Sequence, residues 1–208
     1  MPTATAHPRV MIEAVWPRPG VVREVVLVLA GALLIALAAQ IQVPLPFSPV
    51  PVTGQTFAVL LLGALYGSRR GAATVLAYLV FGAAGLPVFA GAAAGAARLV
   101  GPTAGYLVGF AVAAFVVGAL AERGWDRRSW TTAGAMVLGN LVIYAFGVAW
   151  LSRFVGWDKV MATGVLPFVA GDAAKIVLAT LLLPVGWRFM RRSAGGNPGD
   201  NGGRAGAP

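Results

Sequence analysis

Six apolar runs, separated by short polar or glycine-rich connections, limit what this chain can fold into. The runs cover residues 21–41, 56–66, 72–86, 105–120, 131–151 and 166–189. Several of them reach the roughly 20 residues that an α-helix needs to cross the hydrocarbon core of a bilayer. The pattern predicts an all-α integral membrane protein in which residues 21–192 form one domain of six transmembrane helices.

Composition supports this class and argues against others. Only 11% of the residues are charged, whereas soluble domains average about 25%. The chain has no cysteine, and its single histidine, His7, lies in the polar N-terminal segment. We therefore expect no disulfide, no metal centre and no haem in the membrane region, and no cofactor held by this chain.

The placement of the basic residues predicts the topology. Arg98, Arg153 and Lys159 fall in connections on one side of the membrane, and Lys175 lies within the sixth run. With six crossings, the other twelve of the sixteen basic residues all fall on the opposite side: Arg9, Arg18, Arg23, Arg69, Arg70, Arg123, Arg127, Arg128, Arg188, Arg191, Arg192 and Arg204. Because basic residues accumulate in cytoplasmic segments, both termini are expected in the cytoplasm.

The same charge bias favours a full crossing by the second run, which is short for a span. It also explains the net charge of +9 without a nucleic-acid partner, since the basic residues flank apolar runs and form no stripe. Residues 1–20 are expected to form a cytoplasmic N-terminal tail. Residues 193–208, which are glycine-rich and polar, are expected to form a disordered cytoplasmic C-terminal tail.

Two charged residues lie near the start of the sixth run, in "PFVAGDAAK". Asp172 and Lys175 are three residues apart, so a helix places them on one face. Charges inside a bilayer are costly and usually functional, which favours a pocket in which Lys175 anchors an anionic ligand. Alternatively, both residues lie near the interface, where Lys175 extends toward the headgroups and Asp172 stabilises the helix N-terminus.

Other polar residues are predicted to lie on the same side of the membrane. Asn140 and Tyr144 share a face of the fifth run, where Asn140 either binds a ligand or joins two helices by hydrogen bonds. Gln55 follows a proline-rich stretch, and Arg98 is the only charge between Arg70 and Glu122. Their convergence on one side of the membrane predicts a binding site there.

Two further features bear on function. Ala32 and Ala36 have the small-xxx-small spacing that lets helices approach closely, either inside the protein or against a partner. The sequence contains no G-x-S-x-G, H-E-x-x-H or phosphate-binding Walker motif. A pocket without a nucleophile, base or metal is predicted to bind a ligand without transforming it.

Four motifs in order resemble the BioY family, the biotin-specific substrate-binding (S) components of energy-coupling-factor (ECF) transporters. They are "VPLPFSPVPVTGQTFAVLLLGALYG", "GLPVFAG", "GPTAGYLVGF" and "PFVAGDAAK". The resemblance implies six helices, a high-affinity biotin site near the outer face and location in the bacterial cytoplasmic membrane. It also implies three partner subunits: a transmembrane coupling protein and two cytoplasmic ATPases, which would use the ATP.

By the same resemblance, Asn140, Tyr144, Asp172 and Lys175 match the family's binding positions, and Ala32 and Ala36 match its docking surface. Asn140 and Asp172 suit the cyclic urea of biotin, which both donates and accepts hydrogen bonds. Lys175 or Arg98 suits the carboxylate. The alternative is a scaffold protein, or a small membrane enzyme, in which Asp172 and Lys175 form only a structural ion pair.

Overall fold

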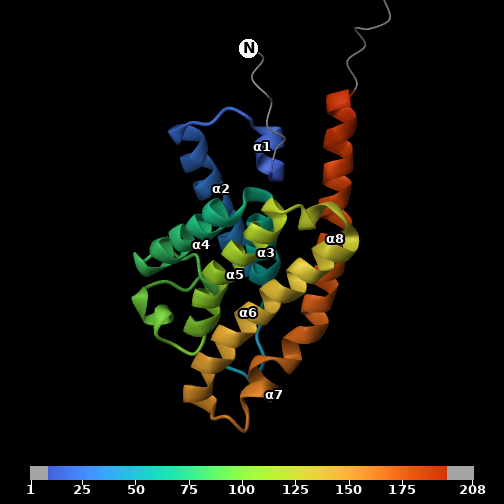
Figure 1. Cartoon of the computed structure of the whole chain (residues 1–208). Coiled ribbons are helices and arrows are strands. Elements are labelled where there is room, and N and C mark those ends of the chain that lie inside the picture. Colours follow the sequence, from blue (N-terminus) through green and yellow to red (C-terminus); the bar gives the residue numbers. More distant parts are fainter. Residues whose placement is uncertain (1–8, 196–208) are drawn as a thin grey trace, which may run out of the picture.

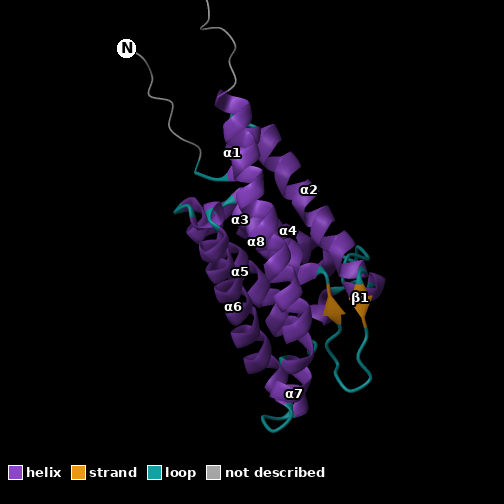
Figure 2. Ribbon diagram, turned by 90° about the vertical axis from the view of Figure 1, so that its right-hand side faces the viewer, coloured by secondary structure: helices purple, strands orange, loops and turns teal. Residues whose placement is uncertain are grey.

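The computed structural model describes residues 9–195, with side chains described to residue 190. It is a bundle of helices with one small hairpin (Figures 1 and 2). The elements are α1 (Met11–Val15), α2 (Val21–Gln40), β1 (Gln42–Val43), β2 (Val52–Thr53), α3 (Gln55–Tyr66), α4 (Ser68–Ala83), the 3-10 turns η1 (Ala90–Ala92) and η2 (Ala96–Leu99), α5 (Ala104–Glu122), the 3-10 turn η3 (Trp125–Arg127), α6 (Ser129–Val155), α7 (Val160–Gly164) and α8 (Leu166–Gly195).

Helix α5 lies at the centre of the bundle and packs against α3, α4 and α6. Close approach depends on glycines. A Cβ on Gly63 of α3 would lie 2.7 Å from the carbonyl oxygen of Ala114, and one on Gly118 of α5 would lie 2.4 Å from the nitrogen of Ser68. Real Cβ atoms do not approach this closely, so small residues set the helix spacing, as is usual in membranes.

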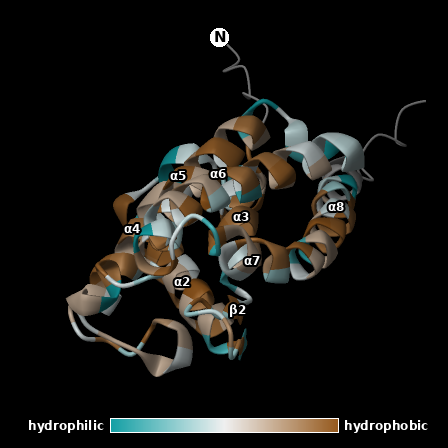
Figure 3. Cartoon of the chain, turned by 90° about the horizontal axis from the view of Figure 1, so that it is seen from below, coloured by the Kyte–Doolittle hydropathy of each residue, from teal (hydrophilic) through white to brown (hydrophobic). Residues whose placement is uncertain are grey.

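Four helical segments of the described part are long and apolar enough to cross a membrane: Val21–Gln40, Ala104–Glu122, Ser129–Val155 and Val160–Met190. The helices consist mainly of hydrophobic residues (Figure 3), and many of the large ones are exposed, among them Leu33, Leu141 and Leu181. Helix α3 has 12 residues and α4 has 16, which is less than the usual spanning length. The chain is thus a multi-pass membrane protein by length and composition, and the expected count of six spans is not established by these helices.

The described residues are mostly helical, as predicted, and contain one short pair of strands. The proline-rich segment forms a short antiparallel hairpin in which Gln42 pairs with Thr53 and Val43 with Val52. Proline lacks the backbone N–H that a helix interior requires, so residues 44–51 form the loop of this hairpin. The loop is held by Ser48, whose hydroxyl donates to the carbonyl oxygen of Thr163 at 2.7 Å.

The predicted N-terminal tail also contains structure. Val10 is only 1% exposed, and α1 is tied to the bundle through Arg70, which bonds Glu13 at 3.3 Å and Glu24 at 2.8 Å. Burial of an apolar side chain and an ion-pair network therefore order a segment that its polar composition marks as a tail. The expected C-terminal tail, 193–208, lies mostly outside the described residues, which end at Gly195. Its first three residues belong to α8.

Candidate ligand-binding site

A cavity of about 340 Å³ is lined in part by the hairpin and its loop. The hairpin lies away from α1, toward the other end of the bundle (Figure 2). The volume of the cavity is within the range of small-molecule sites. The hairpin and its loop, α3, α4, the loop that carries η1 and η2, α5, α6 and α8 all contribute to its lining. Segments from across the whole sequence therefore meet at this cavity.

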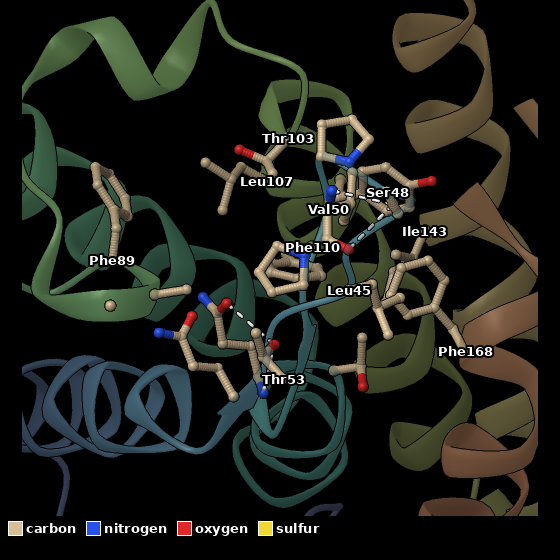
Figure 4. A pocket seen from close by; sticks show the side chains of 18 of the residues that line it. Leu45, Ser48, Val50, Thr53, Phe89, Thr103, Leu107, Phe110, Ile143 and Phe168 are labelled. Carbon is tan, nitrogen blue, oxygen red and sulfur yellow. Dashed lines mark hydrogen bonds between the residues drawn. The ribbon is translucent and has the colours of Figure 1, made fainter. Parts of the chain in front are cut away.

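Aromatic side chains form the apolar walls of the cavity. Phe89 and Phe168 lie on opposite sides of it (Figure 4). Phe89 packs edge-on against Tyr78 with ring centroids 5.5 Å apart. Tyr106 lies 6.3 Å from Phe168 and donates its hydroxyl to the carbonyl oxygen of Gly164 at 2.7 Å. Such walls suit a compact apolar ring system.

The carboxylate of Asp172 is 4% exposed and is held by three neighbours. Its Oδ1 accepts hydrogen bonds from Lys175 at 2.9 Å and from Thr56 at 3.1 Å. Its Oδ2 accepts a short hydrogen bond from the hydroxyl of Tyr144. A buried charge needs this degree of compensation, and one acceptor position of the four on the carboxylate is left for a ligand.

The ammonium of Lys175 is committed within the protein. It donates to the carbonyl oxygen of Thr53 at 2.8 Å and to Thr56 Oγ1 at 2.7 Å, in addition to Asp172. An ammonium has three donors, so all of them are used. Lys175 therefore connects α8 to the end of β2 and to α3, and its charge is balanced by Asp172.

Gln55 is buried at the cavity wall with unused hydrogen-bonding capacity. Its Nε2 donates to the hydroxyl of Tyr78 at 2.7 Å, and its Oε1 accepts from Thr53 at 3.2 Å. A side-chain amide has two donors and two acceptor positions. One of each is therefore left to face the cavity.

Arg98 contributes the second cation of the cavity lining. It lies in η2, is exposed, and has no ion pair or hydrogen bond from its side chain to any residue between 9 and 190. Its guanidinium is therefore free to bind an anion in two-point geometry. The structure brings five predicted site residues to one cavity: Gln55, Arg98, Tyr144, Asp172 and Lys175.

Asn140 is not brought there. It is buried four residues before Tyr144, and its amide Nδ2 donates to the carbonyl oxygen of Met136 at 3.0 Å. It faces a separate void of only about 10 Å³ between α3, α6 and α8. Its Oδ1 has no hydrogen-bond partner among the described residues. Thr56 and Lys175 line both this void and the larger cavity, whereas Asn140 lines only the void.

Ala32 and Ala36 do not form an exposed docking surface in this structure. They are 2% and 7% exposed, because α2 turns this face toward α4 and α3. The exposed face of α2 is a different one, formed by Val22, Val25, Val26, Leu29, Leu33 and Leu37. In this structure the face that carries the small-xxx-small spacing therefore packs inside the chain, and its role in docking stays a prediction.

Sequence reasoning missed Gln40, which organises one wall of the cavity. Its Nε2 donates to the carbonyl oxygens of Ala36 at 3.0 Å and Phe89 at 3.2 Å, and its Oε1 accepts from the N–H of Ala92 at 2.9 Å. Ala92 has a positive φ of 54°, which is uncommon outside glycine. One glutamine at the end of α2 therefore holds the turn that presents Phe89. A polar residue ending an apolar helix was the only signal for it.

Fold and site together define a class of protein: a multi-pass membrane protein with a small-molecule cavity lined by aromatic, amide and charged groups. No cluster of metal-ligating side chains occurs within the described part of the chain. The chain belongs to the BioY family, because the model of that family matches residues 6–192.

Curated relatives agree with this assignment. A probable biotin transporter BioY from Pyrococcus horikoshii is 40% identical over 160 residues, which cover 77% of this chain and 93% of the relative. A biotin transporter BioY from Thermotoga maritima is 43% identical over 150 residues, covering 72% and 86%. One from Rhizobium etli is 40% identical over 162 residues, covering 74% and 87%.

A solved structure shares the fold. It is the crystal structure of the S component for biotin from an ECF-type ABC transporter, which superposes with a TM-score of 0.71 and covers 80% of this chain and 92% of that one. The sequence identity is 23%, so this comparison concerns the fold.

Proposed function

We propose that this chain is the high-affinity biotin-binding membrane subunit of a vitamin uptake transporter. Membership of the BioY family and the names of relatives at 40% identity support the substrate. The observation that carries the proposal is the cavity itself, which has aromatic walls. Its polar groups are the guanidinium of Arg98, the buried carboxylate of Asp172 and the amide of Gln55, which has one donor and one acceptor position unused. The chain is accordingly a binding protein and not an enzyme.

The chemistry of biotin matches these groups one by one. Its fused rings are compact and apolar and suit the walls formed by Phe89, Tyr106 and Phe168. Its cyclic urea donates and accepts, which are the two capacities left on Gln55, while Asp172 has one position for a urea N–H. Gln55 thereby takes the role that the sequence assigned to Asn140.

The valerate carboxylate is assigned to Arg98. Both cations line the cavity, but the three donors of Lys175 are occupied by the protein. Binding the ligand through Lys175 would break one of these bonds, whereas Arg98 has none to break. Lys175 and Tyr144 then act as positioning residues that hold the Asp172 carboxylate in place by hydrogen bonds.

The transport step requires partners. This chain has no phosphate-binding motif, so the energy of ATP is proposed to come from a membrane coupling protein and two cytoplasmic ATPases. Burial of Ala32 and Ala36 means that docking through them requires α2 to turn away from α4. The exposed apolar face of α2 contacts either lipid or a partner.

The membrane placement is proposed to be six crossings of the bacterial cytoplasmic membrane, with both termini in the cytoplasm. The distribution of basic residues supports it. The shortness of α3 is accommodated because α3 is largely buried between α2, α4 and α5 and begins at the cavity. Helix α3 thus needs little contact with lipid. The cavity then opens toward the outside.

One observation favours the alternative of a structural role for the pair. Lys175 and Asp172 satisfy each other, as a purely structural ion pair would. Tritiated biotin binding to the purified protein in detergent separates the two functions. Saturable 1:1 binding, displaced by unlabelled biotin and not by thiamine, is expected. Absence of displaceable binding by a folded, monodisperse sample would refute the proposed function.

A further inference from the structure

A second hollow lies on the outer surface of the bundle, between α5 and α6. It has a volume of about 510 Å³ and is almost entirely apolar. We call it the α5–α6 groove, and its lining residues are Leu99, Ala104, Gly105, Val108, Ala145, Phe146, Ala149, Trp150 and Arg153. It shares no lining residue with the ligand cavity, although the adjacent residues Arg98 and Leu99 of η2 line the cavity and the groove respectively.

Small residues create the groove. A Cβ on Gly105 would lie 2.4 Å from both the carbonyl oxygen of Phe146 and the Cβ of Trp150, so the two helices nearly touch there. Ala145 and Ala149 are exposed alanines on the facing turns of α6. The side chains of Val108 and Phe146 also line the groove and are 50% and 41% exposed. The result is an apolar channel open to the side of the bundle.

The mouth of the groove carries an oriented cation. Arg153 lies in the last turn of α6 and is exposed. Its guanidinium lies 4.8 Å from the centre of the Trp150 ring, in the geometry of a cation–π contact. The indole is itself fixed, because its Nε1 donates to the carbonyl oxygen of Gly101 at 2.9 Å. Arg153 has no carboxylate partner among residues 9–190.

These features specify a ligand with an apolar chain and an anionic head. A groove on a spanning helix pair faces hydrocarbon, where water does not fill an apolar space. Tryptophan and arginine near a helix end lie at the level of the lipid headgroups. A guanidinium binds a phosphodiester through two parallel hydrogen bonds, which an ammonium cannot reproduce.

We propose that the α5–α6 groove binds an anionic phospholipid, with one acyl chain along the alanines and glycine and the phosphodiester at Arg153. The lipid belongs to the leaflet next to the ligand cavity. A zwitterionic lipid offers the same chain and phosphate but carries its own cation, which offsets the attraction to Arg153. Anionic lipid is therefore preferred.

The test is native mass spectrometry of the purified full chain after delipidation and addition of phosphatidylglycerol or phosphatidylcholine. Wild type is expected to retain more phosphatidylglycerol. Arg153→Gln should lower the apparent affinity for phosphatidylglycerol about tenfold or more, because it removes the charge-assisted hydrogen bonds to the phosphodiester. Ala149→Phe and Ala145→Leu, both at exposed positions, should fill the groove and lower retention of both lipids.

Lys159→Gln is the matched control, because Lys159 is an exposed cation in the connection that follows α6. It should retain phosphatidylglycerol like wild type. Inorganic phosphate at the same concentration should not displace the lipid, because it lacks the acyl chain. Equal retention of the two lipids by wild type, or unchanged phosphatidylglycerol affinity in Arg153→Gln, would overturn the proposal. Unchanged retention in both groove-filling variants would do the same, and none of these outcomes depends on biotin binding.

Discussion

Lys175 and Asp172 lie one turn apart on α8, with Nζ of the lysine 2.9 Å from Oδ1 of the aspartate. Thr56 belongs to the same arrangement, because its hydroxyl accepts from Lys175 and donates to Asp172. Lys175 and Asp172 therefore neutralise each other, and together they contribute no net charge to the cavity. Arg98 is the other cation of the cavity lining, and we propose that it binds the anionic end of the ligand.

This relationship predicts that substitutions of the two cations differ in their effects on biotin and on biotinamide. Arg98→Gln should weaken biotin binding about 10- to 150-fold, since it removes a charge-assisted interaction of about 1.5–3 kcal/mol. It should weaken the binding of biotinamide, which lacks the carboxylate charge, much less. Titration calorimetry with both ligands measures the difference. Equal losses for the two ligands would show that Arg98 does not meet the carboxylate.

Lys175→Met should instead weaken both ligands alike and lower thermal stability. It leaves the buried carboxylate of Asp172 without its cation, and an uncompensated buried charge is strongly destabilising. The same calorimetry, together with a melting curve in detergent, measures this. If this variant lost affinity for biotin but not for biotinamide, the carboxylate of biotin would be assigned to Lys175 instead of Arg98.

Gln40 is predicted to support ligand affinity without touching ligand. Gln40→Met removes the hydrogen bonds that hold Phe89 and Ala92, each of about 0.5–1.5 kcal/mol, and should lower biotin affinity by about tenfold. Gln40→Glu keeps the acceptor for the N–H of Ala92 and should lie between Met and wild type. Affinities of the three proteins, measured beside their melting temperatures, give the ranking. Wild-type affinity in Gln40→Met would contradict this role.

Burial predicts the effect of substitutions on α2. Ala32→Trp places a large side chain at a position that is 2% exposed, and overpacking costs about 1–3 kcal/mol or more. It should lower the melting temperature and the yield of folded protein. Leu33→Trp, on the next residue and 60% exposed, is the matched control and should be tolerated. A stable Ala32→Trp variant that loses only its partner subunits would restore the docking interpretation.

Topology is testable with two exposed positions at opposite ends of the bundle. Ala96→Cys lies in η2 and Ser129→Cys at the start of α6, and both side chains are accessible in the structure. In intact cells, a membrane-impermeant thiol reagent should label the first and not the second. Because the chain has no natural cysteine, the reagent can label it only at the introduced cysteine. Labelling in the reverse pattern would invert the proposed orientation.

Asp126 gives a prediction on pH. It lies outside the spanning helices, is buried, and accepts a hydrogen bond from the indole of Trp187 at 2.5 Å. Burial raises the pKa of its carboxyl above the ordinary 3.8, although the Trp187 hydrogen bond opposes this. The folded state therefore binds more protons than the unfolded state. The protonated carboxyl of Asp126 therefore contributes its full stabilising free energy below the pKa that it has in the unfolded state. That contribution is lost as the pH rises through the pKa of the folded state.

Asp126→Asn should remove that contribution, because the amide is neutral at every pH. Its melting temperature should fall less than that of wild type as pH is raised from about 4. Melting curves at several pH values in one detergent measure the slope. Parallel pH profiles for the two proteins would show that Asp126 does not titrate in this range.

The sequence by itself determined the class of protein and much of the site. Apolar runs of spanning length exclude a soluble fold, because no core of this size can bury them. The spacing of Asp172 and Lys175 places them on one helical face in any helix, and the structure shows them bonded. The four ordered motifs indicated the BioY family, which the family match confirms. Proline in residues 44–51 excluded a helix there, although the hairpin itself was not foreseen.

Only the tertiary structure decided how each helix is rotated about its axis. Tyr144 faces the cavity and Asn140 does not, although four residues amount to a rotation of only about 40° and a rise of about 6 Å. Ala32 and Ala36 face inward on a helix that is apolar all round. In soluble proteins an amphipathic pattern marks the buried face. In a membrane both lipid and protein interior are apolar, so that pattern is lost, and packing against neighbouring helices sets the orientation.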